Sequence, residues 1–203
     1  MKKGLELRIS PVVAGILVLM VMTDRSGVCF WTLLAAFLHE VSHLLAARLL
    51  KIPLGELRLG FLGARIEVRG RMLSYGEEWL LCSAGPLSSL FLAVLGALFW
   101  DVFAAARLFS CASLLLGVLN LLPIRTFDGG RMLECLLLGC LGERAAERVM
   151  GVCSFLFLSL LWGVSAYFLL RAGDGLSMLC FSVSLFFRFF GGEGEEGGEN
   201  GRI

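Results

Sequence analysis

The sequence has little charge for its length. Of 203 residues, 17% are charged and 58% are apolar, whereas soluble domains carry about 25% charged and 45–50% apolar residues. The apolar excess lies in long blocks, which indicate membrane-spanning segments. The net charge is only +1, so there is no electrostatic reason to expect a nucleic-acid partner.

Paired cysteines of the metal-binding kind are also lacking. Seven cysteines are present, but no two have the CxxC spacing and most lie inside apolar blocks, where cysteine packs as a small hydrophobe. The apolar stretch after Met1-Lys2-Lys3 is not followed by a small-x-small cleavage site. We therefore interpret it as a retained membrane span and not as a signal peptide.

Long apolar segments recur along the chain. A transmembrane helix needs about 20 mostly apolar residues, and six segments reach or approach this length, at residues 9–22, 28–50, 79–100, 102–122, 149–170 and 176–190. Lys and Arg gather in the N-terminal tail and in the loops after the second and fourth segments, and such residues collect on the cytoplasmic side. We expect an all-α polytopic membrane protein with about six transmembrane helices and both termini in the cytoplasm.

Three further segments have patterns of their own. Residues 53–78 alternate polar and apolar residues on either side of two glycines, which predicts a β-hairpin, either a plain cytosolic one or one at the membrane surface beside an active site. Residues 131–149 are amphipathic, as is typical of an interfacial helix. Residues 191–203 are rich in glycine and glutamate and are expected to be a disordered tail, so residues 1–190 form the predicted core.

The only two histidines, His39 and His43, stand four residues apart with Glu40 between them. On a helix this spacing places both imidazoles on one face. The segment reads H-E-V-S-H, the H-E-x-x-H pattern in which both histidines bind Zn²⁺ and the glutamate is the general base. The alternative is a chance pair on a helix. Ionisable residues inside an apolar span are costly and indicate function, so the zinc site is the preferred interpretation.

A catalytic zinc usually takes three protein ligands and one water. The best candidate for the third ligand is Asp128, which follows the fourth apolar segment on the predicted cytoplasmic side. Pro123 ends that helix, and Gly129-Gly130 frees the backbone after it. The alternative is an ordinary aspartate in a turn, and the residues alone leave the two interpretations equal.

The two motifs together carry a family resemblance. With H-E-V-S-H at residues 39–43 and N-x-x-P-x-x-x-x-D-G-G at residues 120–130, the chain resembles the site-2 protease family of intramembrane metalloproteases. The resemblance implies that Asp128 is the third zinc ligand, that Asn120 positions the substrate and that the hairpin is membrane-associated. The compact chain further resembles the branch that contains the stage IV sporulation protease, which processes a transcription-factor precursor.

A third stretch matches the family in part. Ala84-Gly85-Pro86 corresponds to a family motif, but Ser89 stands where the family often has asparagine three residues after the proline. The role of Ser89 is therefore open.

The sequence thus predicts an intramembrane zinc metalloprotease that cuts membrane-spanning or membrane-tethered proteins, with its active site open to the cytosol. The lipid bilayer and regulatory membrane proteins are the other expected partners. A transporter, or a metal or proton relay, is one alternative, but its polar residues would be spread through several spans. An inactive protease-like binding protein is the other, and the complete H-E-x-x-H motif argues against it.

Overall fold

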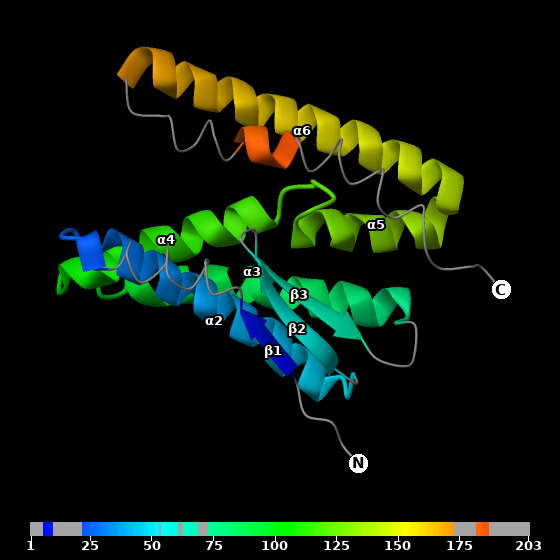
Figure 1. Ribbon diagram of the computed structural model, residues 1–203, viewed down its shortest axis with the longest axis horizontal. Coiled ribbons are helices and arrows are strands. Elements are labelled where there is room, and N and C mark those ends of the chain that lie inside the picture. The colour runs from blue at the N-terminus through cyan, green and yellow to red at the C-terminus, as the bar shows by residue number, and fades with distance from the viewer. Residues whose placement is uncertain are drawn as a thin grey trace. The chain divides into compact units, whose positions relative to one another are not determined.

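The computed structural model describes residues 6–9, 22–52, 54–60, 63–68, 73–172 and 182–186. The chain divides into two compact units, Met1–Leu121 and Leu122–Ile203. In Figure 1 the first unit runs from blue to green and the second from green to orange. The predicted tail at residues 191–203 lies outside the described residues.

The described part of the first unit contains three apolar helices, α2 (Val28–Leu49), α3 (Tyr75–Ala97) and α4 (Ala104–Asn120). They correspond to the second, third and fourth apolar segments of the sequence. Both α2 and α3 are long and apolar enough to cross a membrane, whereas α4 is apolar but shorter. The start of α3 is set by a capping box, in which Ser74 and Glu77 each accept the other's backbone N–H, an arrangement that satisfies otherwise unpaired donors.

The start of α2 is capped by Asp24. Its carboxylate accepts the backbone N–H of Ser26 at 3.0 Å, of Gly27 at 3.1 Å and of Cys29 at 2.7 Å. Gly27 has a φ of 75°, a conformation that glycine adopts without strain. A negative charge at this end also suits the helix dipole.

Small residues bring α3 and α4 together. A β-carbon at Gly96 would lie 3.0 Å from that of Ser110, and one at Gly117 would lie 3.2 Å from that of Ser89. The Ser110 hydroxyl donates across the interface to the carbonyl oxygen of Ala93 at 2.7 Å. Membrane helices associate through close contacts and hydrogen bonds of this kind.

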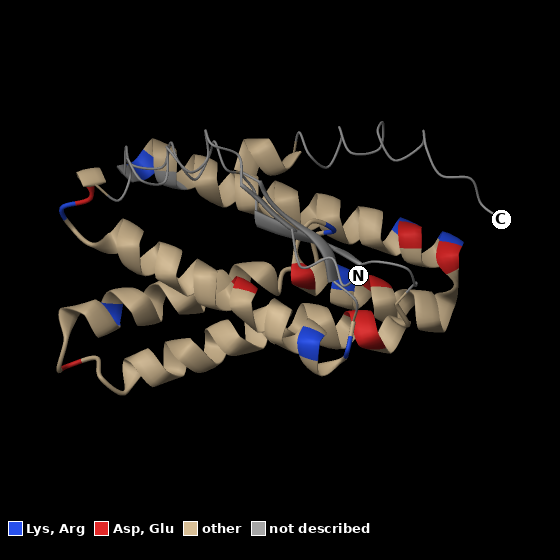
Figure 2. Cartoon of the chain, turned by 60° about the horizontal axis from the view of Figure 1, so that its bottom comes forward, with Lys and Arg blue, Asp and Glu red and all other residues tan. Residues whose placement is uncertain are grey.

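Large apolar side chains point outward instead. Phe37 and Leu45 on α2, and Leu87, Phe91 and Val94 on α3, are all exposed. Figure 2 shows few charged residues along these helices. A surface of this composition suits lipid contact, because large exposed apolar patches are rare on soluble monomers.

The described strands form one sheet in the order β1 (Glu6–Ile9), β2 (Leu54–Gly60) and β3 (Gly63–Val68). Strands β2 and β3 pair antiparallel, lie inside the segment 53–78 and meet at the Gly60–Gly63 pair. Association of this hairpin with a membrane surface remains a prediction. Figure 1 shows the three strands side by side.

Strand β1 was not predicted. It pairs parallel with β2 from Glu6 opposite Glu56 to Ile9 opposite Leu59. The start of the first predicted span at Ile9 is therefore wrong, because Ile9 ends a strand. The remainder of that span, at residues 10–21, lies outside the described residues.

The described part of the second unit contains α5 (Asp128–Leu141), α6 (Glu143–Ala172) and a helical stretch at residues 182–186. The amphipathic helix predicted for residues 131–149 is wrong in extent, because Gly142, with a φ of 77°, separates α5 from α6. Buried Ile124, Leu158 and Leu185 form the apolar core of this unit.

Within the described residues, three helices can cross a membrane by length and composition: α2, α3 and residues Glu143–Arg171 of α6. This points to a membrane protein. Most of the sixth predicted span, at residues 176–190, lies outside the described residues. The number of spans, the location of the termini and the side on which the active site opens remain predictions.

Candidate metal centre

The buried face of α2 carries both histidines. Its four buried residues are Ala35, His39, His43 and Ala47, which recur every fourth position and so form one stripe along the helix. His39 is 3% exposed and His43 7%. Two buried imidazoles between two alanines need polar partners, because an unpaired buried polar group is costly.

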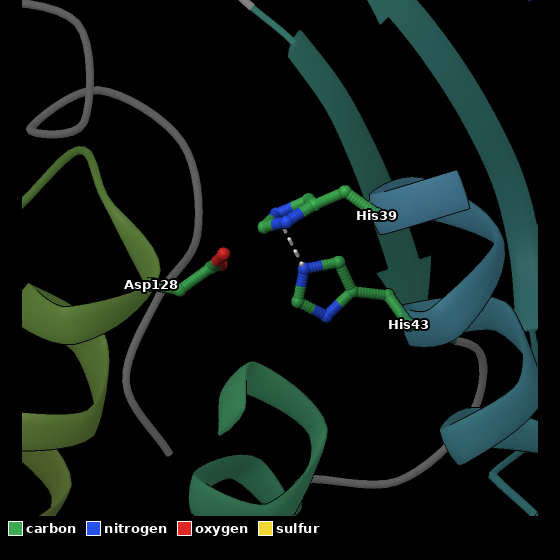
Figure 3. A group of neighbouring side chains, drawn as sticks. All are labelled: His39, His43 and Asp128. Atoms are coloured by element: carbon green, nitrogen blue, oxygen red, sulfur yellow. Dashed lines mark hydrogen bonds between the residues drawn. The ribbon is translucent and has the colours of Figure 1, made fainter. Parts of the chain in front are cut away.

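The two rings turn their Nε2 atoms toward each other. These atoms are 3.3 Å apart, and the rings meet edge to face with centroids 5.0 Å apart. Figure 3 shows this arrangement. Two nitrogens bound to one tetrahedral zinc at 2.0–2.1 Å would be about 3.3–3.4 Å apart. The spacing therefore fits a shared zinc ion.

The remaining ring nitrogen of each histidine contacts α3. Nδ1 of His43 lies 2.8 Å from the carbonyl oxygen of Leu81, and Nδ1 of His39 lies 2.9 Å from the hydroxyl of Ser89. A carbonyl oxygen only accepts, so Nδ1 of His43 carries the proton and, in the neutral ring, Nε2 has a lone pair. That is the tautomer in which Nε2 binds a metal while the other nitrogen donates to a partner.

Gly85 makes room for both rings. A β-carbon at this position would lie 2.7 Å from Cε1 and Nε2 of His39 and would also collide with Nε2 of His43. No ordinary side chain fits there without displacing an imidazole. The small residue of the Ala84-Gly85-Pro86 step thus lets α3 pass directly beside the histidine pair.

Glu40 follows His39 on α2 and is half-buried. One residue along a helix is a rotation of about 100°, so the carboxylate is placed on a neighbouring face of the same turn. The two histidines that could bind a metal and the predicted general base, Glu40, therefore lie within five consecutive residues of α2.

Asp128 belongs to the second unit, where it is half-buried and opens α5. The preceding turn folds back tightly: Phe127 N–H donates to the carbonyl of Ile124 at 2.8 Å, and a β-carbon at Gly130 would collide with that same carbonyl. Gly129 and Gly130 were expected to loosen the backbone after the aspartate. They are instead buried in the first turn of α5, where Gly130 permits the close approach.

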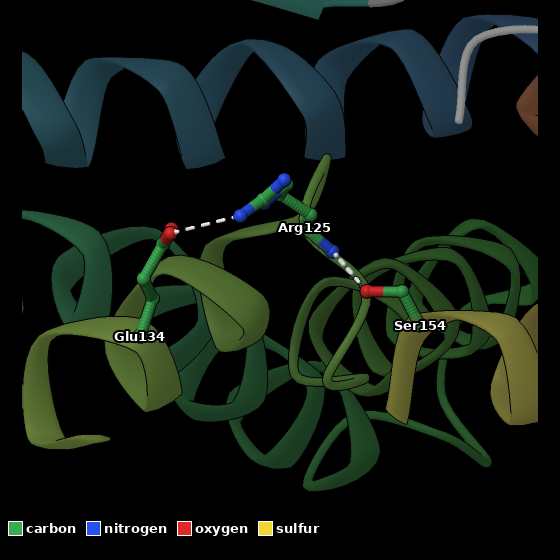
Figure 4. Close-up of polar contacts among 3 residues, drawn as sticks. All are labelled: Arg125, Glu134 and Ser154. Carbon is green, nitrogen blue, oxygen red and sulfur yellow. Dashed lines mark hydrogen bonds and ion pairs between the residues drawn. The ribbon is translucent and has the colours of Figure 1, made fainter. Parts of the chain in front are cut away.

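The turn before Asp128 is also fastened to its surroundings. The backbone N–H of Arg125 donates to the Ser154 hydroxyl on α6 at 3.0 Å. The guanidinium of Arg125 forms an ion pair with Glu134 on α5 at 3.5 Å. Figure 4 shows both contacts. An acidic residue in the first turn is favoured by the helix dipole, so α5 holds Asp128 at a suitable place for a carboxylate.

Asn120 is the last residue of α4. Its side-chain nitrogen donates to the carbonyl oxygen of Leu116 at 3.0 Å, so the amide lies back along its own helix. The predicted role in substrate positioning stays a prediction.

Sequence reasoning placed the histidines but missed their partners on α3. The Leu81 contact is a backbone interaction, which leaves no signal in residue identity. The sequence did show that Gly85 and Ser89 share a face of α3, since they lie four residues apart on either side of Pro86. That this face contacts the histidines depends on how α3 packs on α2, which the sequence does not show.

The fold and these residues define a class of protein: a helical membrane protein in which one apolar helix carries two buried histidines spaced to bind a metal ion. Residues 97–164 match the profile of peptidase family M50. This stretch includes Asn120 and Asp128 but not the H-E-x-x-H segment. No curated protein matches the chain.

The fold is similar to a solved structure described as "Site-2 Protease from Methanocaldococcus jannaschii". The TM-score is 0.63 at 18% sequence identity, covering 95% of this chain and 88% of the other. At this identity the likeness establishes the fold. The resemblance to the site-2 protease family predicted from the two motifs is thus confirmed, whereas the likeness to its sporulation branch stays a prediction.

Proposed function

We propose that this protein is an intramembrane zinc metalloprotease that hydrolyses peptide bonds of membrane-spanning or membrane-tethered proteins. The observation that carries the proposal is the histidine pair. Two buried Nε2 atoms lie 3.3 Å apart while each Nδ1 has a partner on α3. Two facing lone pairs repel each other unless a cation or a proton lies between them, and zinc fits that position.

In this proposal His39, His43 and Asp128 are the three protein ligands. Each can offer one ligand atom, a ring nitrogen or a carboxylate oxygen. Figure 3 labels all three side chains. Two imidazoles and one carboxylate are a donor set found in catalytic zinc sites, which keep the fourth position for water.

Glu40 is the proposed general base. When bound, zinc supplies a water of lowered pKa and polarises the scissile carbonyl. An Oε atom of Glu40 accepts the proton from the attacking water as the new C–O bond forms. The same carboxyl then donates that proton to the leaving amine as the C–N bond breaks, so no other proton source is needed.

The substrate must present an extended segment, because a helix occupies its carbonyl groups in backbone hydrogen bonds. We propose that an edge of the β1–β2–β3 sheet binds this segment as an added strand. Within the described residues, β3 pairs only with β2, so its other edge has no strand partner. Asn120 then contacts the substrate from the end of α4.

Regulated cleavage of a membrane-tethered transcription-factor precursor is the proposed role, with regulatory membrane proteins as further partners. The proposal places both termini in the cytoplasm and opens the active site to the cytosol. Its support is the distribution of Lys and Arg along the chain, because these residues collect on the cytoplasmic side.

A transporter or relay is disfavoured by the same helices. Apart from the end turns of these helices and Glu147 and Arg148 in the second turn of α6, the candidate spans α2, α3 and α6 hold acidic, basic or histidine side chains only at His39, Glu40 and His43. A proton or metal pathway across the bilayer needs such groups at several depths.

The test is to purify the native protein and a His43→Ala variant and to assay each with a membrane-tethered substrate. The native protein is expected to retain about one zinc ion per chain and to cleave, while the variant loses both properties. Native protein that binds no zinc, or a His43→Ala variant that still cleaves, would contradict the proposal.

A further inference from the structure

Ser89 is a buried serine of α3 whose hydroxyl contacts a side chain of another helix. It is 1% exposed, and its oxygen lies 2.9 Å from Nδ1 of His39. Two other serines of α3 behave differently: Ser83 donates to the carbonyl of Leu80 and Ser88 donates to the carbonyl of Gly85, both within their own helix.

Two proton arrangements fit the distance between Ser89 and His39. If the hydroxyl donates, Nδ1 of His39 has the lone pair and Nε2 carries the proton. If the hydroxyl accepts, Nδ1 carries the proton and the lone pair of Nε2 points toward His43. Only the second arrangement leaves both Nε2 atoms able to bind one metal ion.

A serine hydroxyl serves either arrangement because it both donates and accepts. Alanine serves neither, and it would remove the acceptor that the Ser89 hydroxyl offers to the Nδ1 proton of His39. That loss bears on the metal-binding tautomer, since the metal occupies the other nitrogen.

Ser89 acts from a fixed position. Leu81, Gly85 and Ser89 recur every fourth residue on α3, so they form one stripe that faces the histidine pair. The carbonyl of Leu81 contacts His43, the missing side chain of Gly85 leaves room for both rings, and the hydroxyl of Ser89 contacts His39. Behind this stripe, α4 approaches so closely that a β-carbon at Gly117 would lie 3.2 Å from that of Ser89.

We propose that Ser89 is a positioning residue of the metal centre. Its hydroxyl accepts the Nδ1 proton of His39 and so keeps Nε2 of that ring as the metal-binding atom, as the Leu81 carbonyl does for His43. The inference rests on the proposed zinc site and goes beyond it by assigning the group that sets the tautomer of one ligand.

The first measurement is zinc affinity, by competition with a chelating dye, for Ser89→Ala and Ser88→Ala. Both remove one hydroxyl from neighbouring positions of α3. Loss of a partner of a metal-bound histidine typically weakens metal binding about 10–100-fold, so this weakening is expected for Ser89→Ala, with native affinity for Ser88→Ala. Equal affinities of the two variants would overturn the proposal.

The second measurement uses the native protein and does not depend on how a variant folds. The chain has only two histidines, so histidine-selective ¹⁵N labelling reports these two rings alone. In zinc-loaded protein, His39 is expected to carry its proton on Nδ1 and to bind through Nε2. Binding through Nδ1 would overturn the assignment to Ser89.

The two measurements separate this inference from the proposed function. If the native protein takes up no zinc, the zinc site and the role of Ser89 fall together. If the native protein binds zinc and Ser89→Ala binds it equally well, only the role of Ser89 falls.

Discussion

Gly85 on α3 lies so close to His43 on α2 that a β-carbon at Gly85 would collide with Nε2 of that histidine. Gly85→Ala is therefore expected to displace an imidazole, at a cost of about 1–3 kcal/mol. Zinc affinity should fall by roughly ten- to a hundredfold. Gly76→Ala is the control on the same helix, because a β-carbon there meets nothing within 4 Å. Native zinc affinity in Gly85→Ala would show that the rings lie elsewhere.

Glu40→Gln should abolish cleavage while zinc stays bound. The amide keeps the shape of the side chain but accepts no proton, and loss of a general base costs about 10²–10⁴ in rate. The measurement is turnover of a reconstituted membrane-tethered substrate, together with the zinc content of the same sample. Undiminished turnover would remove Glu40 from the mechanism, and lost zinc would make it a ligand.

Asp128→Ala should lower both zinc content and cleavage, since two histidines leave zinc short of the usual three protein ligands. Asp101→Ala is the control, because Asp101 is exposed in the turn between α3 and α4. Asp24 is unsuitable as a control since it caps α2. If Asp128→Ala keeps a full zinc equivalent with unaltered affinity, the aspartate is no ligand and acts through the substrate instead.

Cysteine labelling tests the topology. In a variant whose seven cysteines are replaced, Lys51→Cys and Arg125→Cys should both react from the cytosolic side, because Lys and Arg gather in these loops. Asp101→Cys, between α3 and α4, should react from the opposite side. Labelling of Lys51→Cys and Arg125→Cys from opposite faces would separate the histidine pair from Asp128 and exclude a shared site.

Acid should loosen the start of α2. The hydroxyl of Ser26, with help from the backbone N–H groups of Cys29, Ser26 and Phe30 and against some desolvation, lowers the pKa of Asp24 below its usual 3.8. A lowered folded-state pKa contributes stability above pH 3.8 that is lost as the pH falls through the folded value. Asp24 is partly open to solvent, and solvent screening keeps the effect small.

The measurement for Asp24 is a ¹³C titration of its carboxyl group in detergent micelles. The midpoint should lie below 3.8 in the native protein and move up toward that value in Ser26→Ala. A native midpoint at or above 3.8 would show that these hydrogen bonds are not formed.

The sequence predicted best what depends on local spacing. His39 and His43 lie on one face of α2 because an i, i+4 pair does so on any helix, and the ends of α2 and α4 fall close to the ends of the apolar segments. The contact of His43 with the Leu81 carbonyl depends on how two helices pack. No residue type announces such a contact, so it could be found only in the structure.

Two errors at the level of elements have physical causes. Glu6-Leu7-Arg8-Ile9 alternates as a strand does and resembles Glu56-Leu57-Arg58-Leu59, its partner in β2. This strand is only four residues long and adjoins a long apolar run, so the sequence predicted a span that begins at its last residue, Ile9. Gly142 stands in a stretch that reads as one amphipathic helix, and only its φ of 77° shows that the helix ends there.

The close contacts between α3 and α4 limit how the protein can move. Gly96 against Ser110 near one end, and Gly117 against Ser89 further along, fasten the two helices at separate points. Packed interfaces of this kind do not deform continuously. We therefore expect α3 and α4 to move together as one rigid body. In the proposed protease, the movement that admits a substrate to the histidine pair must then involve other elements, and cross-linking α3 to α4 should leave the rate of substrate entry unchanged.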